Sequence, residues 1–168
     1  ENTHNKCYGY PLSLNYINEV CDLGHNNNIC IHMDGARIFN ACTALNTPAD
    51  IILKNVDSVT FCLSKGLSAP IGSILCGSRN FINKARKIRK SLGGGMRQSG
   101  IIAAAGIIGL KHMQTRLKDD HINAYHLASG IASINGIEVS LNHVKTNIIY
   151  FSFSHRTINT AQLLESMQ

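Results

Sequence analysis

The stretch "DSVTFCLSKGLSAPIGSILCGS", residues 57–78, contains two short apolar runs joined by a loop of small residues. We expect strands over residues 57–63 and 71–77, because both runs are short and bounded by turn-forming residues. The loop between them places Lys65 among small side chains. A lysine in a surface loop is the commoner explanation of such a stretch. A reachable amine with small neighbours is also what a lysine needs to react covalently with a flat carbonyl-bearing ring.

Strands and helices alternate on both sides of this stretch. The run "ICIHM", residues 29–33, indicates another strand, and short strands are expected near residues 137–140 and 147–153. The apolar segment 98–113 is too short to cross a bilayer, so we expect it to be a helix buried in the protein. Strands that alternate with helices favour an α/β fold with a mostly parallel sheet, in which ligands gather at the carboxyl ends of strands. The other expected helices cover residues 12–24, 34–45, 49–55, 78–92 and 115–134, with one more starting at 159.

The composition suits one globular domain, or one domain and part of a second, since the 168 residues are 44% hydrophobic and 15% charged. No run of 18 apolar residues is present, so no membrane span is expected. The start "ENTHNKCYGY" has neither an initiating Met nor an apolar signal region, which is typical of a chain entered in its middle. Scattered cysteines without a C-x-x-C pair, and histidines without zinc-ligand spacing, favour a reducing cytosolic compartment and no metal site.

Positive charge is concentrated in the middle of the chain. No Asp or Glu occurs between Asp57 and Asp119, although the net charge of the whole chain is only +6. Such a segment can attract nucleic acid, bind phosphate or carboxylate groups of small molecules, or form the solvated face of a basic helix. The scarcity of aromatic residues around the basic stretch 79–97 counts against single-stranded nucleic acid.

Asp34 ends an apolar strand and is followed directly by Gly35 and Arg37. A buried carboxylate needs a cationic partner, which Arg37 could supply in a purely structural role. The alternative is that Asp34 keeps a ring nitrogen protonated, as enzymes that use pyridoxal 5'-phosphate (PLP) require. The order of Asp34 at one strand end and Lys65 after the next strand fits that chemistry.

Four segments together resemble the low-specificity L-threonine aldolases, which are PLP-dependent enzymes of the aspartate aminotransferase fold type (fold type I). They are "ENTHN" (1–5), "IHMDGARIFNA" (31–41), the opening stretch 57–78, and "ARKIRKSLGGGMRQSGIIAAAGI" (85–107). The resemblance implies that residues 1–117 form part of the PLP-binding large domain, without its N-terminal portion. Residues 118–168 would begin a truncated small C-terminal α/β domain. It also implies a cytoplasmic enzyme that forms a homotetramer as the full-length protein.

The resemblance assigns the cofactor contacts residue by residue. Lys65 would hold PLP covalently, with Ser64 beside it, and Asp34 would pair with the pyridine nitrogen. Arg97, expected to open a helix after three glycines, would lie near the cofactor phosphate, where a helix N-terminus also favours an anion.

The same resemblance supplies the substrate contacts. Arg37 would bind the substrate carboxylate, for which a guanidinium is better suited than an ammonium group. His4 would lie near the β-hydroxyl group and take its proton. Lys90 matches a lysine of the family near the site, although a solvated position on a basic helix explains it equally well. His32 precedes Asp34 by two positions on the strand, so both can face the same way, with His32 stacking or supporting.

The implied reaction is the cleavage of L-threonine or L-allo-threonine into glycine and acetaldehyde, within amino-acid metabolism (threonine catabolism and glycine biosynthesis). The expected partners are a small amino-acid substrate and further copies of the chain, with neither nucleic acid nor membrane. Two alternatives stay open: a β-eliminating PLP lyase of the same fold, and an inactive fragment with a basic surface that binds nucleic acid or phosphate. The chain departs from the family in the segments absent at both ends. It departs also in "CYGY" (7–10), which replaces a more glycine-rich stretch.

Overall fold

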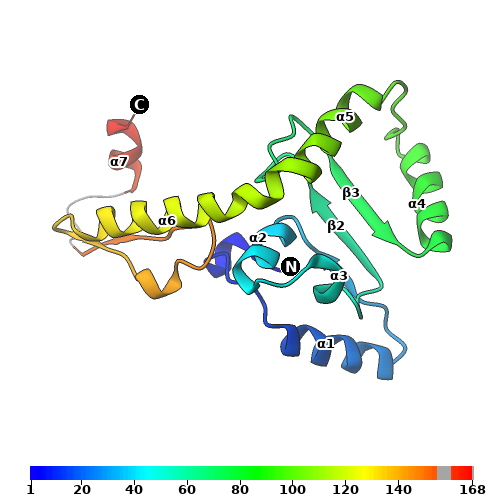
Figure 1. The fold of residues 1–168 in the computed structure, drawn as a ribbon, viewed down its shortest axis with the longest axis horizontal. Coiled ribbons are helices and arrows are strands. Elements are labelled where there is room, and N and C mark those ends of the chain that lie inside the picture. The colour runs from blue at the N-terminus through cyan, green and yellow to red at the C-terminus, as the bar shows by residue number, and fades with distance from the viewer. Residues whose placement is uncertain (155–159, 168) are drawn as a thin grey trace.

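The computed structural model describes residues 1–154 and 160–167, and its centre is a three-stranded sheet (Figure 1). Strand β1 (His32–Asp34) pairs in parallel with β2 (Ser58–Cys62), so that Asp34 lies opposite Thr60. Strand β3 (Ser73–Gly77) pairs antiparallel with β2. The α/β fold is confirmed, but the expectation of a mostly parallel sheet holds only for the first pair. The connection from β2 to β3 contains no helix, and a parallel crossover would need a longer one.

Helices surround this sheet and extend from it, and most lie where the sequence predicts them. Helix α1 (Leu14–Asn26) is capped by Ser13 and α4 (Arg79–Ser91) by Ser78, whose side-chain oxygens accept hydrogen bonds from backbone N–H groups. Helices α2 (Ile38–Leu45) and α3 (Ala49–Ile52) follow β1, and α7 (Thr160–Ser166) lies at the C-terminal end. Helix α5 (Gly100–Ile108) continues through a π-helical turn (Gly109–Met113) and a 3-10 turn (Gln114–Arg116) into α6 (Leu117–Ala132). The remaining elements are 3-10 turns at Asn5–Cys7 and Leu141–His143, and a second antiparallel sheet of β4 (Ile137–Glu138) and β5 (Ser152–Phe153).

The main core lies between helices α1 to α3 and the parallel strands. Its buried side chains come from one face of each helix and from the strand residues that point toward them, as the helical and alternating periods require. Burial of these side chains holds β1 and β2 against the helices. It therefore also determines the positions of the carboxyl ends of both strands. The members are Ile17, Cys21, Met33, Ile38, Ala41, Ile52 and Val59.

Gly24 does not end helix α1, although the sequence predicted that it would. The helix continues to Asn26, and Gly24 is buried beside the side chain of Ile31. A Cβ atom at Gly24 would lie 2.5 Å from Cδ1 of Ile31. The glycine therefore leaves room for the Ile31 side chain against the helix.

Helix α5 is not buried in this chain, which contradicts the expectation for segment 98–113. The side chains of Ile101, Ile107 and Ile108 are 83%, 51% and 60% exposed. The apolar side of the neighbouring helix α4 is similarly open, with Ile88 59% exposed. Nearly all-apolar helices are normally covered, so these two helices present a surface that further protein could bury.

Among the described residues, no helix combines the length and apolar character needed to cross a membrane.

Candidate functional site

A cavity of about 280 Å³ lies at the edge of the main sheet where β1 and β2 end. The two strands are parallel, so their carboxyl ends meet at this edge, and the antiparallel strand β3 begins there. Asp34 and Lys65, the two residues that the sequence linked, both line this cavity. Its other lining residues are Ala36, Thr60, Phe61, Cys62 and Ser73.

The loop that carries Lys65 is anchored from below by apolar side chains. Leu63, Leu67 and Ala69 are buried and form a small core of their own, whereas Lys65 is exposed. Two backbone hydrogen bonds stabilise the loop. The N–H of Leu63 donates to the backbone oxygen of Gly72 over 2.9 Å, and the N–H of Ser68 donates to the backbone oxygen of Lys65 over 2.8 Å. The loop is therefore anchored by its apolar residues, while Lys65 stays exposed and lines the cavity.

Glycines let this loop pack directly on the helix that follows the basic segment. A Cβ atom at Gly109 would lie 2.5 Å from the backbone oxygen of Leu67, and one at Gly106 would lie 2.8 Å from Cδ1 of Leu63. On the loop side, a Cβ atom at Gly66 would lie 2.6 Å from Cδ2 of Leu117. The small residues around Lys65 thus allow the loop to pack against the helix, in addition to leaving the lysine amine accessible.

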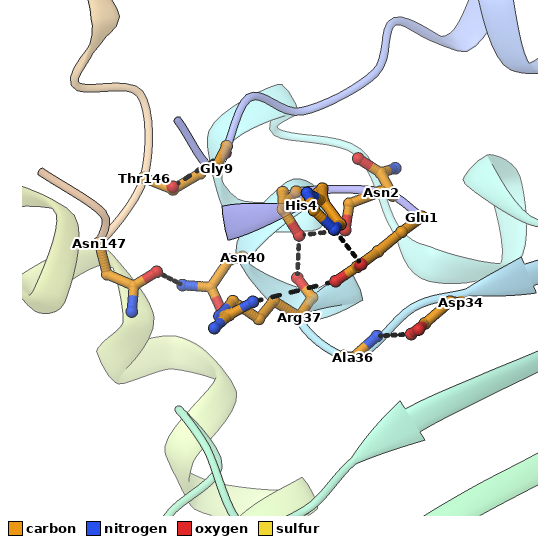
Figure 2. A network of polar contacts seen from close by, with 11 residues as sticks. Glu1, Asn2, His4, Gly9, Asp34, Ala36, Arg37, Asn40, Thr146 and Asn147 are labelled. Atoms are coloured by element: carbon orange, nitrogen blue, oxygen red, sulfur yellow. Dashed lines mark hydrogen bonds and ion pairs between the residues drawn. The ribbon is translucent and has the colours of Figure 1, made fainter. Parts of the chain in front are cut away.

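Asp34 is exposed at the end of β1 and is not paired with Arg37. Its Oδ1 atom accepts a hydrogen bond from the N–H of Ala36 over 2.9 Å (Figure 2), and its backbone is held by neighbouring strands and the N-terminal segment. The ion pair of Arg37 is instead with Glu1, at 4.0 Å between Nη1 and Oε1. The purely structural explanation of Asp34, a buried carboxylate neutralised by Arg37, is therefore wrong, and the carboxylate faces the cavity that it shares with Lys65.

The ring of His32, on β1, forms hydrogen bonds to two hydroxyl groups of the neighbouring parallel strand β2. Its Nδ1 lies 2.9 Å from the hydroxyl oxygen of Ser58, and its Nε2 lies 2.8 Å from that of Thr60. Thr60 also lines the cavity, directly across the strand pair from Asp34. Of the two roles predicted for His32, the structure agrees with a supporting one through Thr60.

The N-terminal segment brings His4 and Arg37 together through a shared carboxylate (Figure 2). Glu1 Oε2 lies 3.2 Å from His4 Nε2, while Glu1 Oε1 faces Arg37. Asn2 and Thr3 are fully buried, and Thr3 has a φ of 57°, which is unusual for a β-branched residue. Its hydroxyl donates a hydrogen bond to the backbone oxygen of Arg37 over 3.2 Å.

The Nδ1 atom of His4 is buried and has no hydrogen-bond partner among the described residues. With Nε2 held by the carboxylate of Glu1, Nδ1 is the nitrogen left to exchange a proton. Neither His4 nor Arg37 lines the cavity beside Lys65. The structure therefore places His4 and Arg37 on the two carboxylate oxygens of Glu1, outside the lining of the cavity that Asp34 shares with Lys65.

The remaining predicted site residues do not line this cavity. Ser64 is exposed beside Lys65, and Arg97 is exposed in a bend between α4 and α5. Arg97 does not open helix α5, because the helix begins at Gly100. Lys90 lies exposed on the last turn of α4, with its side chain against Gly95, as a solvated basic helix would place it.

A buried polar contact joins helix α2 to the C-terminal part of the chain. The Nδ2 atom of Asn40 lies 3.1 Å from Nε2 of His121 on α6 and 3.1 Å from Oδ1 of Asn147, and Asn40 is 3% exposed. An amide N–H can only donate, so His121 must be neutral at Nε2 to accept it. Burial lowers the pKa of His121, an effect that the carboxylate of Asp120 partly offsets.

The lowered pKa of His121 predicts that acid weakens this contact. An unfolded histidine titrates at a pKa of about 6.5 and so binds a proton more readily than folded His121, which means that stability falls as the pH drops from about 7 to about 5. We expect His121→Gln to reduce that pH dependence, measured as the free energy of unfolding in urea at both pH values. His126→Gln, at an exposed position on the same helix, is the matched control. An unchanged pH dependence in His121→Gln would show that another group dominates.

Five residues that line the cavity were not predicted from the sequence: Ala36, Thr60, Phe61, Cys62 and Ser73. Strand alternation puts Thr60 and Cys62 on one face of β2, and the parallel register sets Thr60 opposite Asp34. The signal was therefore present in the spacing, but it required the pairing of β1 with β2 to be known. The described residues contain no cluster of His, Cys, Asp or Glu suited to a metal ion.

Comparison with known proteins finds a matching family and relatives whose names agree with one another. A model of the β-eliminating lyase family matches residues 1–154. The chain is 43% identical over 164 residues to "Low-specificity L-threonine aldolase 1" of Arabidopsis thaliana, covering 98% of this chain and 46% of that protein. It is 49% identical over 128 residues to "Low specificity L-threonine aldolase" of Escherichia coli K12, covering 76% of this chain and 38% of that protein.

Solved structures agree on the fold. A crystal structure of a Listeria monocytogenes protein, provisionally named an L-allo-threonine aldolase, superposes with a TM-score of 0.82 at 21% identity. The superposition covers 95% of this chain and 43% of that one. The chain thus spans less than half the length of these relatives.

Proposed function

Because the chain belongs to the β-eliminating lyase family, we propose that its protein is a PLP-dependent aldolase. It would cleave L-threonine and L-allo-threonine, and similar β-hydroxy-α-amino acids, into glycine and an aldehyde. The observation that carries the proposal is the meeting of Lys65 and Asp34 on one cavity at the carboxyl ends of two parallel strands. Relatives that bear threonine aldolase names support the substrate class.

The donor groups at this cavity fit PLP. The cofactor needs an amine for its aldehyde carbon and a carboxylate for its ring nitrogen, and Lys65 and Asp34 supply them. The volume of about 280 Å³ is near the lower end of the range of about 300–1,000 Å³ usual for ligand pockets. When bound, PLP supplies a ring that accepts the electron pair left by the breaking bond between Cα and Cβ.

The residues of the chain would then divide the remaining tasks. Lys65 holds the cofactor, and Asp34 keeps the ring nitrogen protonated. The hydrogen bond between His32 and Thr60 keeps the second cavity strand in register with Asp34. By keeping the ring nitrogen protonated, Asp34 would let the positively charged ring stabilise the negative charge that develops on the substrate.

Arg37 and His4 would handle the substrate. Arg37 binds its carboxylate in place of Glu1, whose ion pair with Arg37 is long at 4.0 Å and so is readily exchanged. His4 takes the proton of the β-hydroxyl group at Nδ1, the buried nitrogen without a partner among the described residues. Removal of that proton lets the carbonyl of the aldehyde form as the carbon–carbon bond breaks.

We further propose a cytosolic homotetramer in the full-length protein, with a role in threonine breakdown and glycine formation. Arg97 and Ser64 would contribute to cofactor binding there, although they lie outside the cavity lining in this chain. The exposed apolar surface of α5 supports assembly, because a second copy could cover it. The division into a large domain, 1–117, and the start of a small one, 118–168, is part of the same proposal.

The products decide between this activity and β-elimination, which the family name also suggests. Incubation of the PLP-loaded protein with L-threonine should release glycine and acetaldehyde in equal amounts, measured by amino-acid chromatography and by aldehyde reduction coupled to NADH oxidation. Release of ammonia and a keto acid instead would make the protein a β-eliminating lyase and would overturn the proposal.

A further inference from the structure

A second cavity, of about 400 Å³, lies between the N-terminal turn and the C-terminal segment. It shares no lining residue with the cavity beside Lys65. Its walls come from parts of the chain that are more than a hundred residues apart, so only the folded protein forms it. The lining residues are Tyr8, Glu138, Ser140, His143, Val144, Tyr150, Phe151 and Ser152.

Aromatic rings form much of this lining. The ring centroid of Tyr8 lies 5.0 Å from that of His143 and 4.9 Å from that of Tyr150, with the ring planes tilted by 56° and 57°. Phe151 adds a fourth ring to the lining. A cation held over the face of such a ring is attracted by the negative charge of that face, and groups of aromatic rings bind quaternary ammonium ligands in this way.

The charge of the lining fits a cation as well. Among the described residues that line the cavity, Glu138 is the one carboxylate and none is Lys or Arg, although the chain carries a net charge of +6. Glu138 on β4 lies opposite Ser152 on β5, so the acid and a hydroxyl group are neighbours at the cavity. An anionic ligand would meet this carboxylate, and among the described lining residues only His143, when protonated, could offset its charge.

Hydrogen bonds hold the two walls together in advance of any ligand. The buried hydroxyl of Thr146 donates to the backbone oxygen of Gly9 over 3.0 Å (Figure 2), and the hydroxyl of Tyr10 donates to the backbone oxygen of Asn142 over 3.1 Å. Gly9 has a φ of 65°, and a Cβ atom there would lie 2.6 Å from Oγ1 of Thr146. The two walls of the cavity are therefore held together before a ligand binds, so binding does not carry the free-energy cost of ordering them.

We propose that this cavity binds a small ligand through an ammonium group, with the charge beside Glu138 and against the rings of Tyr8 and Tyr150. Tyr8 belongs to the "CYGY" stretch, in which the chain departs from the family that it otherwise resembles. Since the described lining of this cavity is separate from that of the cavity beside Lys65, the proposal is independent of the proposed aldolase chemistry.

Choline and 3,3-dimethyl-1-butanol provide a matched test, because they have the same shape and only choline is charged. Titration of each into the purified protein is followed by NMR through the shift of the ligand methyl protons, which aromatic rings displace upfield. We expect choline to bind on the order of tenfold more tightly than the neutral alcohol. Equal affinity for the two, or no saturable binding of choline, would overturn the proposal.

Two variants locate the binding. Glu138→Gln removes the charge and should bring the affinity for choline close to that for the alcohol, and Tyr150→Leu should abolish the ring-induced shift. Tyr16→Leu, at an exposed tyrosine on helix α1, is the control and should leave both unchanged. Tyr150→Phe keeps the ring and should retain choline binding, which separates loss of the site from loss of the fold. Choline binding that survives both Glu138→Gln and Tyr150→Leu would place the ligand elsewhere and refute the assignment.

Discussion

Asp34→Asn is expected to lower kcat for threonine cleavage by about 10²–10³-fold, the usual effect of removing a preorganised charge from an active site. Asparagine keeps an oxygen that can accept the hydrogen bond from the N–H of Ala36, so the turn after β1 should persist. The change then isolates the negative charge facing the cavity. The measurement is steady-state release of glycine and acetaldehyde by the PLP-loaded protein.

The control for this variant is Asp22→Asn, which makes the same chemical change at an exposed position on helix α1. It should leave kcat unaltered. A visible absorption spectrum of the bound cofactor provides a second readout, since the spectrum of Asp34→Asn should change if the carboxylate pairs with the ring nitrogen. Wild-type kcat and an unaltered spectrum in Asp34→Asn would remove Asp34 from the site.

Gly109→Ala is expected to destabilise the fold by about 2–3 kcal/mol, as overpacking of a close contact does. Its new Cβ atom would lie 2.5 Å from the backbone oxygen of Leu67, and backbone cannot move aside as a flexible side chain can. The same strain should displace the loop that carries Lys65 and weaken cofactor binding. Urea unfolding gives the first quantity, and PLP titration gives the second.

Gly130→Ala is the matched control on helix α6. Apart from its chain neighbours and the backbone of its own helix, nothing lies within 4 Å of the Cβ position at Gly130, so Gly130→Ala should gain about 0.5–1 kcal/mol of stability from the loss of glycine's extra freedom. We therefore expect Gly109→Ala to lower the free energy of unfolding and Gly130→Ala to raise it. If Gly109→Ala were as stable as the wild type, the loop would not depend on this contact.

Local sequence signals predicted the elements of the fold well, because each arises within a short segment. The apolar strand runs and the helical spacing both act over a few residues. The antiparallel course of β3 was missed even though its cause, the short connection from β2, is visible in the sequence. The exposure of α5 could not be predicted, because burial depends on which other parts of a protein are present.

Part of the candidate site could likewise be predicted from the sequence, and part could not. Asp34 ends one strand and Lys65 follows the next, and the rule that parallel strands end at one edge of a sheet was sufficient to bring them together. The contact of Arg37 with Glu1, rather than with Asp34, depends on the path of the N-terminal segment across α2, which no local pattern encodes. Family resemblance supplied the roles of His4 and Arg37.

Covalent trapping of PLP tests the central claim most directly. The protein is incubated with PLP, treated with borohydride, digested, and examined by mass spectrometry for a peptide that carries the reduced cofactor. We predict the label on Lys65, in a peptide that contains "FCLSK", and no label at this position in Lys65→Ala. A label found mainly on another lysine, such as Lys90, or an absorbing cofactor complex that persists in Lys65→Ala, would contradict the assignment of this cavity as the PLP site.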